Sequence, residues 1–567
     1  MTNVLDYKDM SASVTPAMRQ YLDAKQQNRD AILLFRMGDF YEMFYEDALV
    51  ASRALELTLT SRSKDTNGGG IPMCGVPFHA VDGYIARLVR KGFRVAICDQ
   101  VEDPRKAKGI VKREVVRVVS PGTLTDASYL DAREPAFLMA IAPPPFLAGG
   151  AAQASSGPRH AGRRDDGGTI GVALLDLSTG EFSAAEYAGA DGIQALADEL
   201  AVLRPREIVV PAGVTPGQLS PAILAACPAI ATSGPSVTPV DGWMFDPESA
   251  RRVLLDQLQA GTLDGFGLDR HPFAVAAAGA LVHYLRDTQK ADLAHVRAIA
   301  YRQRADHLLV DPTTLKHLEI LEGADGGREG SLLNELDRTV TSMGSRLLRA
   351  WLLRPLVALE PIRDRLDAVE ELAYRSTERG KLREAVKPVL DLERLVARAA
   401  LGTAGPRDLV GLERSLALIP RVRTVLTDLQ APLVRSLVAE LDDVPDVRHE
   451  IARTLVDEPP VLARDGGFTR DGVDPDLDAL TGISRSGKQV IAEMEDRERA
   501  RTGISSLKVR YNRVFGYYIE VSKSNLHAVP PDYHRKQTIA GGERFITPAL
   551  KEYEEKVLGA DERILER

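Results

Sequence analysis

Residues 31–45 read Ala-Ile-Leu-Leu-Phe-Arg-Met-Gly-Asp-Phe-Tyr-Glu-Met-Phe-Tyr. The apolar run 31–35 is typical of a β-strand, and Gly38-Asp39 is typical of a tight turn. Residues 40–44 then resume an extended pattern. The stretch therefore predicts two strands joined by a short turn, and the rest of a small α/β domain can be placed around them.

Side-chain alternation along the second strand has a chemical consequence. If residues 40–44 are extended, Phe40 and Glu42 lie on one face and Tyr41 and Met43 on the other. An aromatic ring and a carboxylate would then project together just after a glycine-containing turn. The alternative is an ordinary strand whose aromatic side chains pack in the core while Glu42 faces water. The pattern alone leaves both open.

Further strands are predicted at 95–98 and 115–119, so residues 1–128 should form a small mixed α/β domain. Beyond them, Ala142–Gly168 is mainly Pro, Ala, Gly and Ser with a few charges. Such a composition cannot bury a core, and we expect a flexible surface loop there.

A second α/β domain is predicted between residues 129 and 285. Its signals are two strands around a Ser-Thr-Gly turn, then a helix and another strand, at 170–176, 181–187, 193–203 and 208–210. Alternating strands and helices favour a sheet covered by helices.

The chain becomes helical beyond about residue 285, and we expect long helices there. Apolar residues spaced by three or four predict one helix face at Leu332, Leu336, Val340, Met343 and Leu347. A second helical pattern runs from Leu477 to Met494 and ends near Gly503.

A β-rich insertion interrupts this helical half. Leu507–Val509 and Tyr517–Val521 alternate like strands. Thr547 is then a predicted N-cap, and Pro548 suits the first turn of a returning helix. Because no stop signal precedes Arg567, we expect both this helix and the protein to be truncated.

Composition excludes several classes of protein. The 567 residues are 44% hydrophobic and 27% charged, without the 18-residue apolar run of a membrane span or a signal peptide. Cys74, Cys98 and Cys227 are too scattered for a disulfide framework or zinc site, so we expect reduced core thiols. Neither HExxH nor GxSxG occurs, which disfavours ordinary metallo- or serine hydrolases.

The net charge of −8 argues against a nucleic-acid partner if it is taken as an average. The charge is unevenly distributed, however. Residues 87–117 hold ten basic and four acidic side chains, a net +6, and residues 501–544 hold eight and three, a net +5. The second window also contains Tyr and Phe, which favours a phosphate backbone. A solvated charged face is the alternative for either window.

One stretch imitates a nucleotide-binding loop. Gly482–Gln489 matches GxxxxGK, but Gln489 stands where Ser or Thr should hold magnesium. A helical pattern precedes it instead of a strand. The sequence therefore disfavours a nucleotide-dependent enzyme that uses this loop.

Five stretches together resemble the MutS family of bacterial DNA mismatch repair proteins: Gly38–Ala48, Ile71–Ala80, Thr339–Arg346, Gly516–Ile519 and Leu550–Glu554. The resemblance implies two small mixed α/β domains, then a long-helix core and lever domain with an inserted β-rich clamp. The expected boundaries are 1–128 for mismatch binding, 129–285 for a connector, 286–482 for core and lever helices, 483–544 for the clamp and 545–567 for a returning lever helix.

The resemblance also implies roles for individual residues. Phe40 would be a wedge stacked at a mispair from the minor groove, and Glu42 would hydrogen-bond the displaced base. From charge and proximity we add DNA contacts at Met37, Arg62, Arg113 and Arg117. Sequence-independent backbone contacts by the clamp are expected from Lys508, Arg510, Arg513, Arg535 and Lys536.

Partners and cofactors follow from the same resemblance. We expect duplex DNA with a mismatch or small loop, a MutL-like protein, a homodimer in the full-length form, and a cytoplasmic, nucleoid-associated location in a bacterium. The family's ATPase domain, which binds ATP and Mg²⁺, would lie beyond residue 567, so residues 1–567 should bind neither and have no catalytic activity alone. A MutS-like paralogue acting as a scaffold on branched or recombination DNA is the alternative, which Phe40 and Glu42 argue against.

Overall fold

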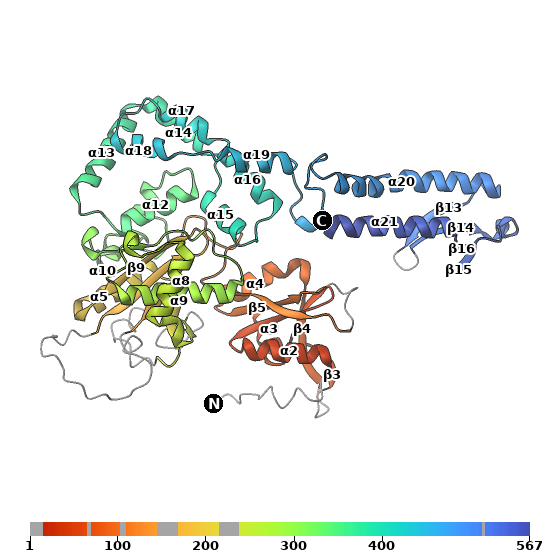
Figure 1. The fold of residues 1–567 in the computed structure, drawn as a ribbon, viewed down its shortest axis with the longest axis horizontal. Helices are drawn as coiled ribbons and strands as arrows, with labels where there is room; N and C mark the ends of the chain where they lie inside the picture. The colour runs from red at the N-terminus through yellow and green to blue at the C-terminus, as the bar shows by residue number, and fades with distance from the viewer. Residues whose placement is uncertain are drawn as a thin grey trace. The chain divides into compact units, whose positions relative to one another are not determined.

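The computed structural model describes residues 15–64, 70–102, 109–126, 128–143, 168–214, 237–512 and 516–566 (Figure 1). The chain divides into two compact units. The first comprises Met1–Ala404 and Arg414–Asp443, and the second comprises Gly405–Glu413 and Val444–Arg567. Two six-stranded sheets lie in the first unit, and a four-stranded sheet lies in the second.

The first sheet has the strand order β3-β4-β2-β1-β5-β6, in which β1 and β5 are parallel. Its strands are β1 (Ala31–Met37), β2 (Phe40–Phe44), β3 (Thr60–Lys64), β4 (Gly70–Pro77), β5 (Arg94–Gln100) and β6 (Arg113–Val119). Apolar side chains of α3 (Tyr45–Leu55) and α4 (Val81–Arg90) pack on one face, and those of α2 (Pro16–Gln27) pack on the other. The predicted strands and turn at residues 31–44, and the strands at 95–98 and 115–119, are confirmed.

A buried ion pair joins α2, β1 and α3 beneath this sheet. Lys25 Nζ lies 2.8 Å from Asp47 Oδ1 and also donates to Ala31 O at 2.6 Å. Asp47 Oδ2 accepts hydrogen bonds from Leu33 N at 3.0 Å and Tyr21 Oη at 3.2 Å. Because every polar atom of this group is paired inside the protein, its charges are tolerated at low exposure.

The second sheet has the order β11-β10-β7-β8-β9-β12. Its strands are β7 (Phe137–Ala142), β8 (Ile170–Asp176), β9 (Glu181–Tyr187), β10 (Glu207–Pro211), β11 (Val237–Val240) and β12 (Ala300–Tyr301). One face packs on α8 (Pro247–Leu258) and α9 (Pro272–Gln289), and the other packs on α5 (Gly189–Leu203). The predicted strand–turn–strand, helix and strand are confirmed.

Some of the expectations for this part of the chain concern residues that the structure does not describe. Residues 144–167 of the predicted loop and Cys227 lie outside them. Cys74 and Cys98 are buried free thiols. The expected domain boundary at residue 285 falls inside α9, whose apolar side chains belong to the core of the second sheet.

The helices that follow are shorter than the sequence led us to expect. They are α10 (Pro312–His317), α11 (Leu332–Leu336), α12 (Ser342–Leu353), α13 (Leu359–Tyr374), α14 (Ser376–Val386), α15 (Leu392–Ala400), α16 (Pro406–Leu416), α17 (Ile419–Leu426), α18 (Pro432–Glu440) and α19 (Pro445–Thr454). The longest of them has 16 residues. Among all the residues that the structure describes, no helix is both long and apolar enough to cross a membrane.

The predicted helix face from Leu332 to Leu347 is wrong, because the chain breaks between α11 and α12. Asp337 ends the first helix and accepts hydrogen bonds from Thr339 and Ser345, at 2.6 Å and 2.7 Å. Thr341 then caps α12 by accepting from Gly344 N. Short polar side chains that bond nearby backbone or hydroxyl groups favour such breaks over a continuous helix.

The second unit is built on two long helices with a sheet between them in the sequence. α20 (Pro475–Thr502) has 28 residues and ends at Gly503, and α21 (Pro548–Glu566) packs against it. The sheet has the order β13-β14-β16-β15 and is antiparallel, with β13 (Lys508–Asn512), β14 (Gly516–Ser522), β15 (His534–Ile539) and β16 (Gly542–Ile546). Thr547 Oγ1 accepts from Leu550 N, as the predicted N-cap requires. The expected clamp boundary at residue 483 falls inside α20.

Replacing Lys25 by methionine should destabilise the first sheet. The variant leaves the Asp47 carboxylate buried without its ammonium partner, which costs about 3–5 kcal/mol. Hydrogen exchange of peptides covering residues 16–55, measured at increasing urea concentration, should report earlier opening. Lys290→Met, which breaks the more exposed pair with Asp287, is the control and should change this opening little. Equal effects of the two variants would contradict the assignment.

Candidate nucleic-acid interface

The hairpin of β1 and β2 is closed by the two residues Gly38 and Asp39, because Met37 pairs with Phe40. Gly38 has a φ of +60°, which a glycine adopts without strain and which suits the first central position of a type II′ turn. The Arg36 guanidinium donates from Nε to Gly38 O at 2.5 Å. The turn therefore has both the residue type and the hydrogen bond that fix its shape.

Strand β4 supports the hairpin from the other side. Phe40 pairs with Pro77, and Phe78 N donates to Asp39 O at 2.9 Å. The Arg36 guanidinium lies 3.8 Å from the centre of the Phe78 ring. The two stretches quoted first for the family resemblance, which are about 30 positions apart in the sequence, thus meet at one turn.

Exposure along β2 is the reverse of that of an ordinary strand. The Phe40 side chain is 47% exposed, whereas Glu42 is only 7% exposed. Tyr41 and Met43 are buried in the core beneath α3 and α4. Glu42 instead lines a cavity of about 120 Å³ on the other face, together with Met37. The predicted division into two faces is confirmed. The alternative of core aromatic side chains and a solvated Glu42 is right for Tyr41 and Phe44, but it is wrong for Phe40 and for Glu42.

Tyr41 holds the core side of the hairpin in place. Its hydroxyl donates to Asp99 Oδ2 on β5 at 2.8 Å. Burial and the neighbouring Asp99 carboxylate raise the pKa of Tyr41 above its ordinary value, so the hydroxyl stays a donor at every physiological pH. Because this bond ties β2 to β5, it limits rotation of the strand that carries Phe40.

Arg113 and Arg117 lie on opposite faces of the first sheet. Arg113 is beside the hairpin, where its Nε donates to Arg36 O at 2.6 Å. A bulge at Val116 shifts the register, since Val115 pairs with Cys98 but Arg117 pairs with Ile97. In a regular strand, Arg113 and Arg117 would lie on the same face because they are four residues apart. Arg117 therefore faces α4, where burial lowers its pKa, and only Arg113 lies with the hairpin.

The structure also places Met37 and Arg62, the two other residues expected to contact DNA near Phe40. Met37 pairs directly with Phe40 and is half-buried. Arg62 lies on β3, which pairs with the opposite end of β4 from Pro77, about 20 Å away at 3.3 Å per residue. Its side chain is outside the described residues. The structure thus brings Met37 and Arg113 to the hairpin, but not Arg62 or Arg117.

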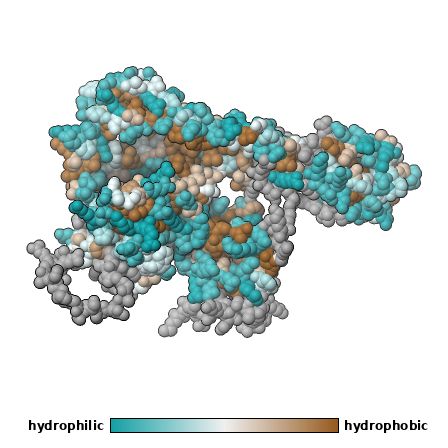
Figure 2. All heavy atoms as spheres, viewed as in Figure 1, coloured by the Kyte–Doolittle hydropathy of each residue, from teal (hydrophilic) through white to brown (hydrophobic). Residues whose placement is uncertain are grey.

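The small sheet of the second unit has one basic face. Lys508 pairs with Glu520 and Arg510 pairs with Tyr518, which places Lys508 and Arg510 on the same face two residues apart. Both side chains are exposed, and neither forms an ion pair with a carboxylate of the described chain. Arg544 pairs with Glu520 across the sheet and belongs to this face. The surface drawn for this unit in Figure 2 is mainly hydrophilic.

The remaining clamp residues are arranged differently. Arg535 pairs with Phe545, a core residue, so it projects at the edge of the opposite face, where it contacts Glu543 at 3.4 Å. Lys536 lies at an irregularity of β15 and is exposed. Arg513 is outside the described residues. The sequence analysis missed Arg544, although its alternation with Glu543 and Phe545 was visible.

Other candidate chemistry finds little support. Gly482–Gln489 forms part of helix α20, so its backbone N–H groups cannot cradle phosphates and the site does not fit ATP. Within the described ranges, no group of His, Cys, Asp or Glu could hold a metal ion.

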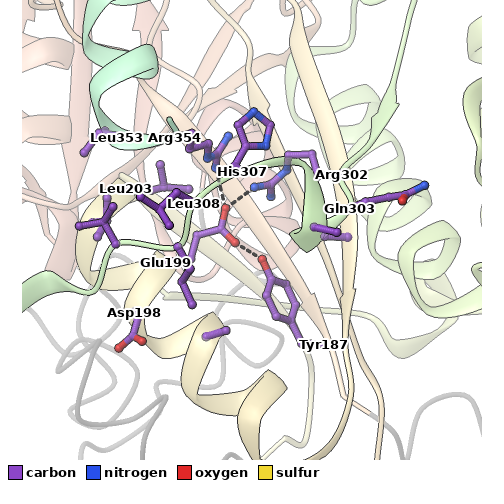
Figure 3. Close-up of a pocket in the computed structure, with 16 residues that line it drawn as sticks. Tyr187, Asp198, Glu199, Leu203, Arg302, Gln303, His307, Leu308, Leu353 and Arg354 are labelled. Carbon is purple, nitrogen blue, oxygen red and sulfur yellow. Dashed lines mark hydrogen bonds and ion pairs between the residues drawn. The ribbon is translucent and has the colours of Figure 1, made fainter. Parts of the chain in front are cut away.

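A pocket of about 390 Å³ lies in the first unit, lined by α5, the chain after β12 and the end of α12 (Figure 3). In it Glu199 accepts hydrogen bonds from Arg302, Arg354 and Tyr187. Burial would raise the pKa of Glu199, but the two guanidinium groups hold it below its ordinary value. Glu199 thus links α5 to the chain after β12 and to the end of α12.

Comparison with known families assigns each part of the fold. Residues 15–128 match MutS domain I, residues 156–297 match MutS domain II, and residues 313–558 match MutS domain III. The domain I match contains the first sheet with its hairpin. The domain II match contains β8 to β11 with α5, α8 and α9, whereas β7 and β12 of the second sheet lie outside it. The domain III match contains the later helices and the small sheet.

Individual relatives give the same result. The chain is 46% identical to the DNA mismatch repair protein MutS of Symbiobacterium thermophilum over 560 residues, and 47% identical to that of Myxococcus xanthus over 553. These alignments cover 98% and 97% of the chain but only 60% and 58% of the relatives, so the chain spans about three fifths of their length. The chain belongs to the MutS family of DNA mismatch repair proteins, and it carries domains I, II and III of that family.

Proposed function

We propose that this chain recognises mispaired or looped duplex DNA by inserting Phe40 into the minor groove at the mispair, while Glu42 hydrogen-bonds the displaced base. The observation that carries this proposal is the pairing of an exposed Phe40 with a largely buried Glu42 on one face of a braced hairpin. A rigid ring at a tip is the geometry of a wedge that unstacks a base step.

The energetics explain why one site can read many different mispairs. Unstacking costs a few kcal/mol per step and is least where pairing is already poor. Bending the duplex adds roughly 1–6 kcal/mol, again less at a flexible step. Selectivity then arises from the ease of deformation, and no specific set of base-edge contacts is needed.

Glu42 adds a penalty that a matched duplex cannot offset. A carboxylate among phosphates is repelled, and its burial against Met37 and Phe44 keeps water from screening it. A displaced base that donates a hydrogen bond to Glu42 compensates for this repulsion. A fully stacked base offers no such donor, so Glu42 disfavours matched DNA.

The exposed basic face of the small sheet suits a contact of a different kind. Lys508 and Arg510 stand side by side on an edge strand without carboxylate partners in the described chain. Such cations bind phosphates without reading sequence. We propose that this face, with Lys536 beside it, is the clamp that grips the DNA backbone.

The remaining family properties are also proposals for this chain. ATP and Mg²⁺ would be bound by the part of the relatives that lies beyond the aligned three fifths. The same part would form most of the homodimer contact. A MutL-like protein would be recruited after recognition, in the bacterial cytoplasm. A scaffold function on branched DNA is the second candidate, but an exposed wedge has no evident use there.

Replacing Phe40 by alanine should abolish discrimination. The wild type should bind a G·T duplex more tightly than a matched one, and the variant should lose about 1–3 kcal/mol of binding free energy on the mispair alone, the usual worth of one aromatic stack. Fluorescence anisotropy with both duplexes measures the two dissociation constants.

The control for this variant is Tyr374→Ala, which removes an aromatic side chain that is 82% exposed on α13. It should leave both dissociation constants unchanged. Equal affinity of the wild type for the two duplexes, also seen in a chain extended by the segment that its relatives carry, would refute mispair recognition.

Glu42→Gln should weaken discrimination by the opposite route. The amide keeps the shape and a hydrogen-bond acceptor but removes the repulsion, so affinity for the matched duplex should rise more than affinity for the G·T duplex. The same anisotropy titrations measure this. A loss of affinity for both duplexes would show that the negative charge of Glu42 is not what disfavours matched DNA.

Lys508→Gln and Arg510→Gln should weaken binding to all duplexes alike. Each should reduce the slope of log affinity against log salt by about 0.9, the contribution of one phosphate contact. Lys381→Gln, at an exposed position on α14, is the control and should leave the slope unchanged. A change in the ratio between G·T and matched duplexes at constant slope would contradict a backbone contact.

A further inference from the structure

The segment between the first two sheets is held by elements on both sides of it. We call residues 120–126 and 128–136, which connect β6 to β7, the interdomain linker. Its second half, residues 129–136, lies between the ranges that match MutS domains I and II. Its two ends are fixed by different parts of the first unit.

The first end is fixed to the second sheet through a fully buried carboxylate. Glu207 on β10 accepts hydrogen bonds from the Ser120 hydroxyl and from Gly122 N at 3.1 Å. The same carboxylate accepts from Tyr284 Oη on α9 at 2.7 Å and from Thr238 Oγ1 at 2.5 Å. With four donors around it, Glu207 ties the linker to both β10 and α9.

The other end is fixed to the helical region through backbone carbonyls. Arg394 on α15 donates to Asp131 O at 2.9 Å and to Glu134 O at 2.8 Å. Arg346 on α12 donates to Ala132 O at 2.9 Å. Two guanidinium groups from two helices thus hold three linker carbonyls within four residues.

Both arginines are buried and their charges are balanced locally. Arg394 is 3% exposed and Arg346 is 9% exposed. Arg346 forms a bidentate pair with Asp391, at 2.6 Å and 2.8 Å, and also contacts Glu393 at 2.6 Å. A planar fork held by carboxylates has little freedom to follow a moving carbonyl, so it fixes the position of the linker.

Helix α12 is itself fixed at both ends. Its start carries the Thr339–Arg346 motif, whose polar side chains shape the turn and place Arg346. Its end leads to Arg354, which donates to Glu199 of α5 at 2.6 Å (Figure 3). A displacement of the linker is therefore resisted by a helix whose end is tied to α5, which packs on the second sheet.

We propose that Arg346 and Arg394 are positioning residues for mispair recognition: they hold the interdomain linker so that the domain carrying Phe40 keeps a fixed orientation against the helical region. The inference rests on the proposed function. Wedge insertion bends DNA only if the domain that carries the wedge cannot rotate away. Without the two anchors, the domain yields in place of the duplex, and the energetic difference between mispaired and matched DNA shrinks.

The test compares Arg394→Gln and Arg346→Gln with the wild type in the 567-residue chain. The readout is the ratio of the dissociation constants for matched and G·T duplexes. We expect this ratio to fall about tenfold, which corresponds to ~1.4 kcal/mol. Arg365→Gln is the matched control, because that guanidinium stacks on Trp351 of α12 at 3.6 Å and should leave the ratio unchanged.

A second measurement detects the linker without DNA. Arg133 lies in the linker between the anchored carbonyls, so trypsin should cleave after Arg133 faster in both Gln variants than in Arg365→Gln. Arg394→Lys retains the charge and one of the two hydrogen bonds, and should show an intermediate ratio and an intermediate cleavage rate even if Arg394→Gln folds poorly.

The outcomes separate the inference from the proposed function. An unchanged ratio in Arg394→Gln and Arg394→Lys, or an equal loss of affinity for both duplexes, overturns the positioning role while leaving mispair recognition intact. A wild type without preference for the G·T duplex overturns the proposed function and this inference with it.

Discussion

The register between β1 and β2 is the constraint on which the proposed site depends. A two-residue turn makes Met37 pair with Phe40, and side chains alternate strictly beyond that point. A slip of one residue would bury Phe40 and expose Tyr41, because it would exchange the two faces of the strand. The positive φ of Gly38 and the bond from Arg36 hold the turn, while the buried Lys25–Asp47 pair holds the sheet below it.

Local patterns predicted what depends on neighbouring residues. The strands of the first two domains and the alternation of Phe40 and Glu42 follow from sequence spacing alone. Tertiary effects were not accessible in that way: the burial of Glu42, the bulge that sends Arg117 to the other face, and the break at Asp337 that divides an apparent helix. Distant packing buries Glu42, and one inserted residue turns Arg117 to the other face. The break at Asp337 comes from local polar side chains, which a count of apolar spacing does not consider.

The net charge of the chain does not show where its positive surfaces lie. The total of −8 disguises two basic windows, but a basic window is not yet a basic surface. In the first window Arg113 bonds Arg36 O, Arg87 bonds Leu55 O, and Lys91 bonds Ala54 O. Because these cations already bind backbone carbonyls of the domain, they are less available to phosphates of DNA. The proposed electrostatic grip therefore rests more on the small sheet than on the domain that carries Phe40.

Several buried polar groups lie where domains join, in addition to the Lys25–Asp47 pair inside the first domain. Glu207 lies between the linker and the second sheet, and Arg394 lies between the linker and α15. Replacing a whole buried pair by well-packed apolar side chains often leaves stability unchanged, so the contribution of such groups is better sought in orientation than in stability. Hydrogen bonds have direction and apolar contacts do not. A protein that reads deformation needs its domains held at defined angles, and directional bonds at the joints provide this.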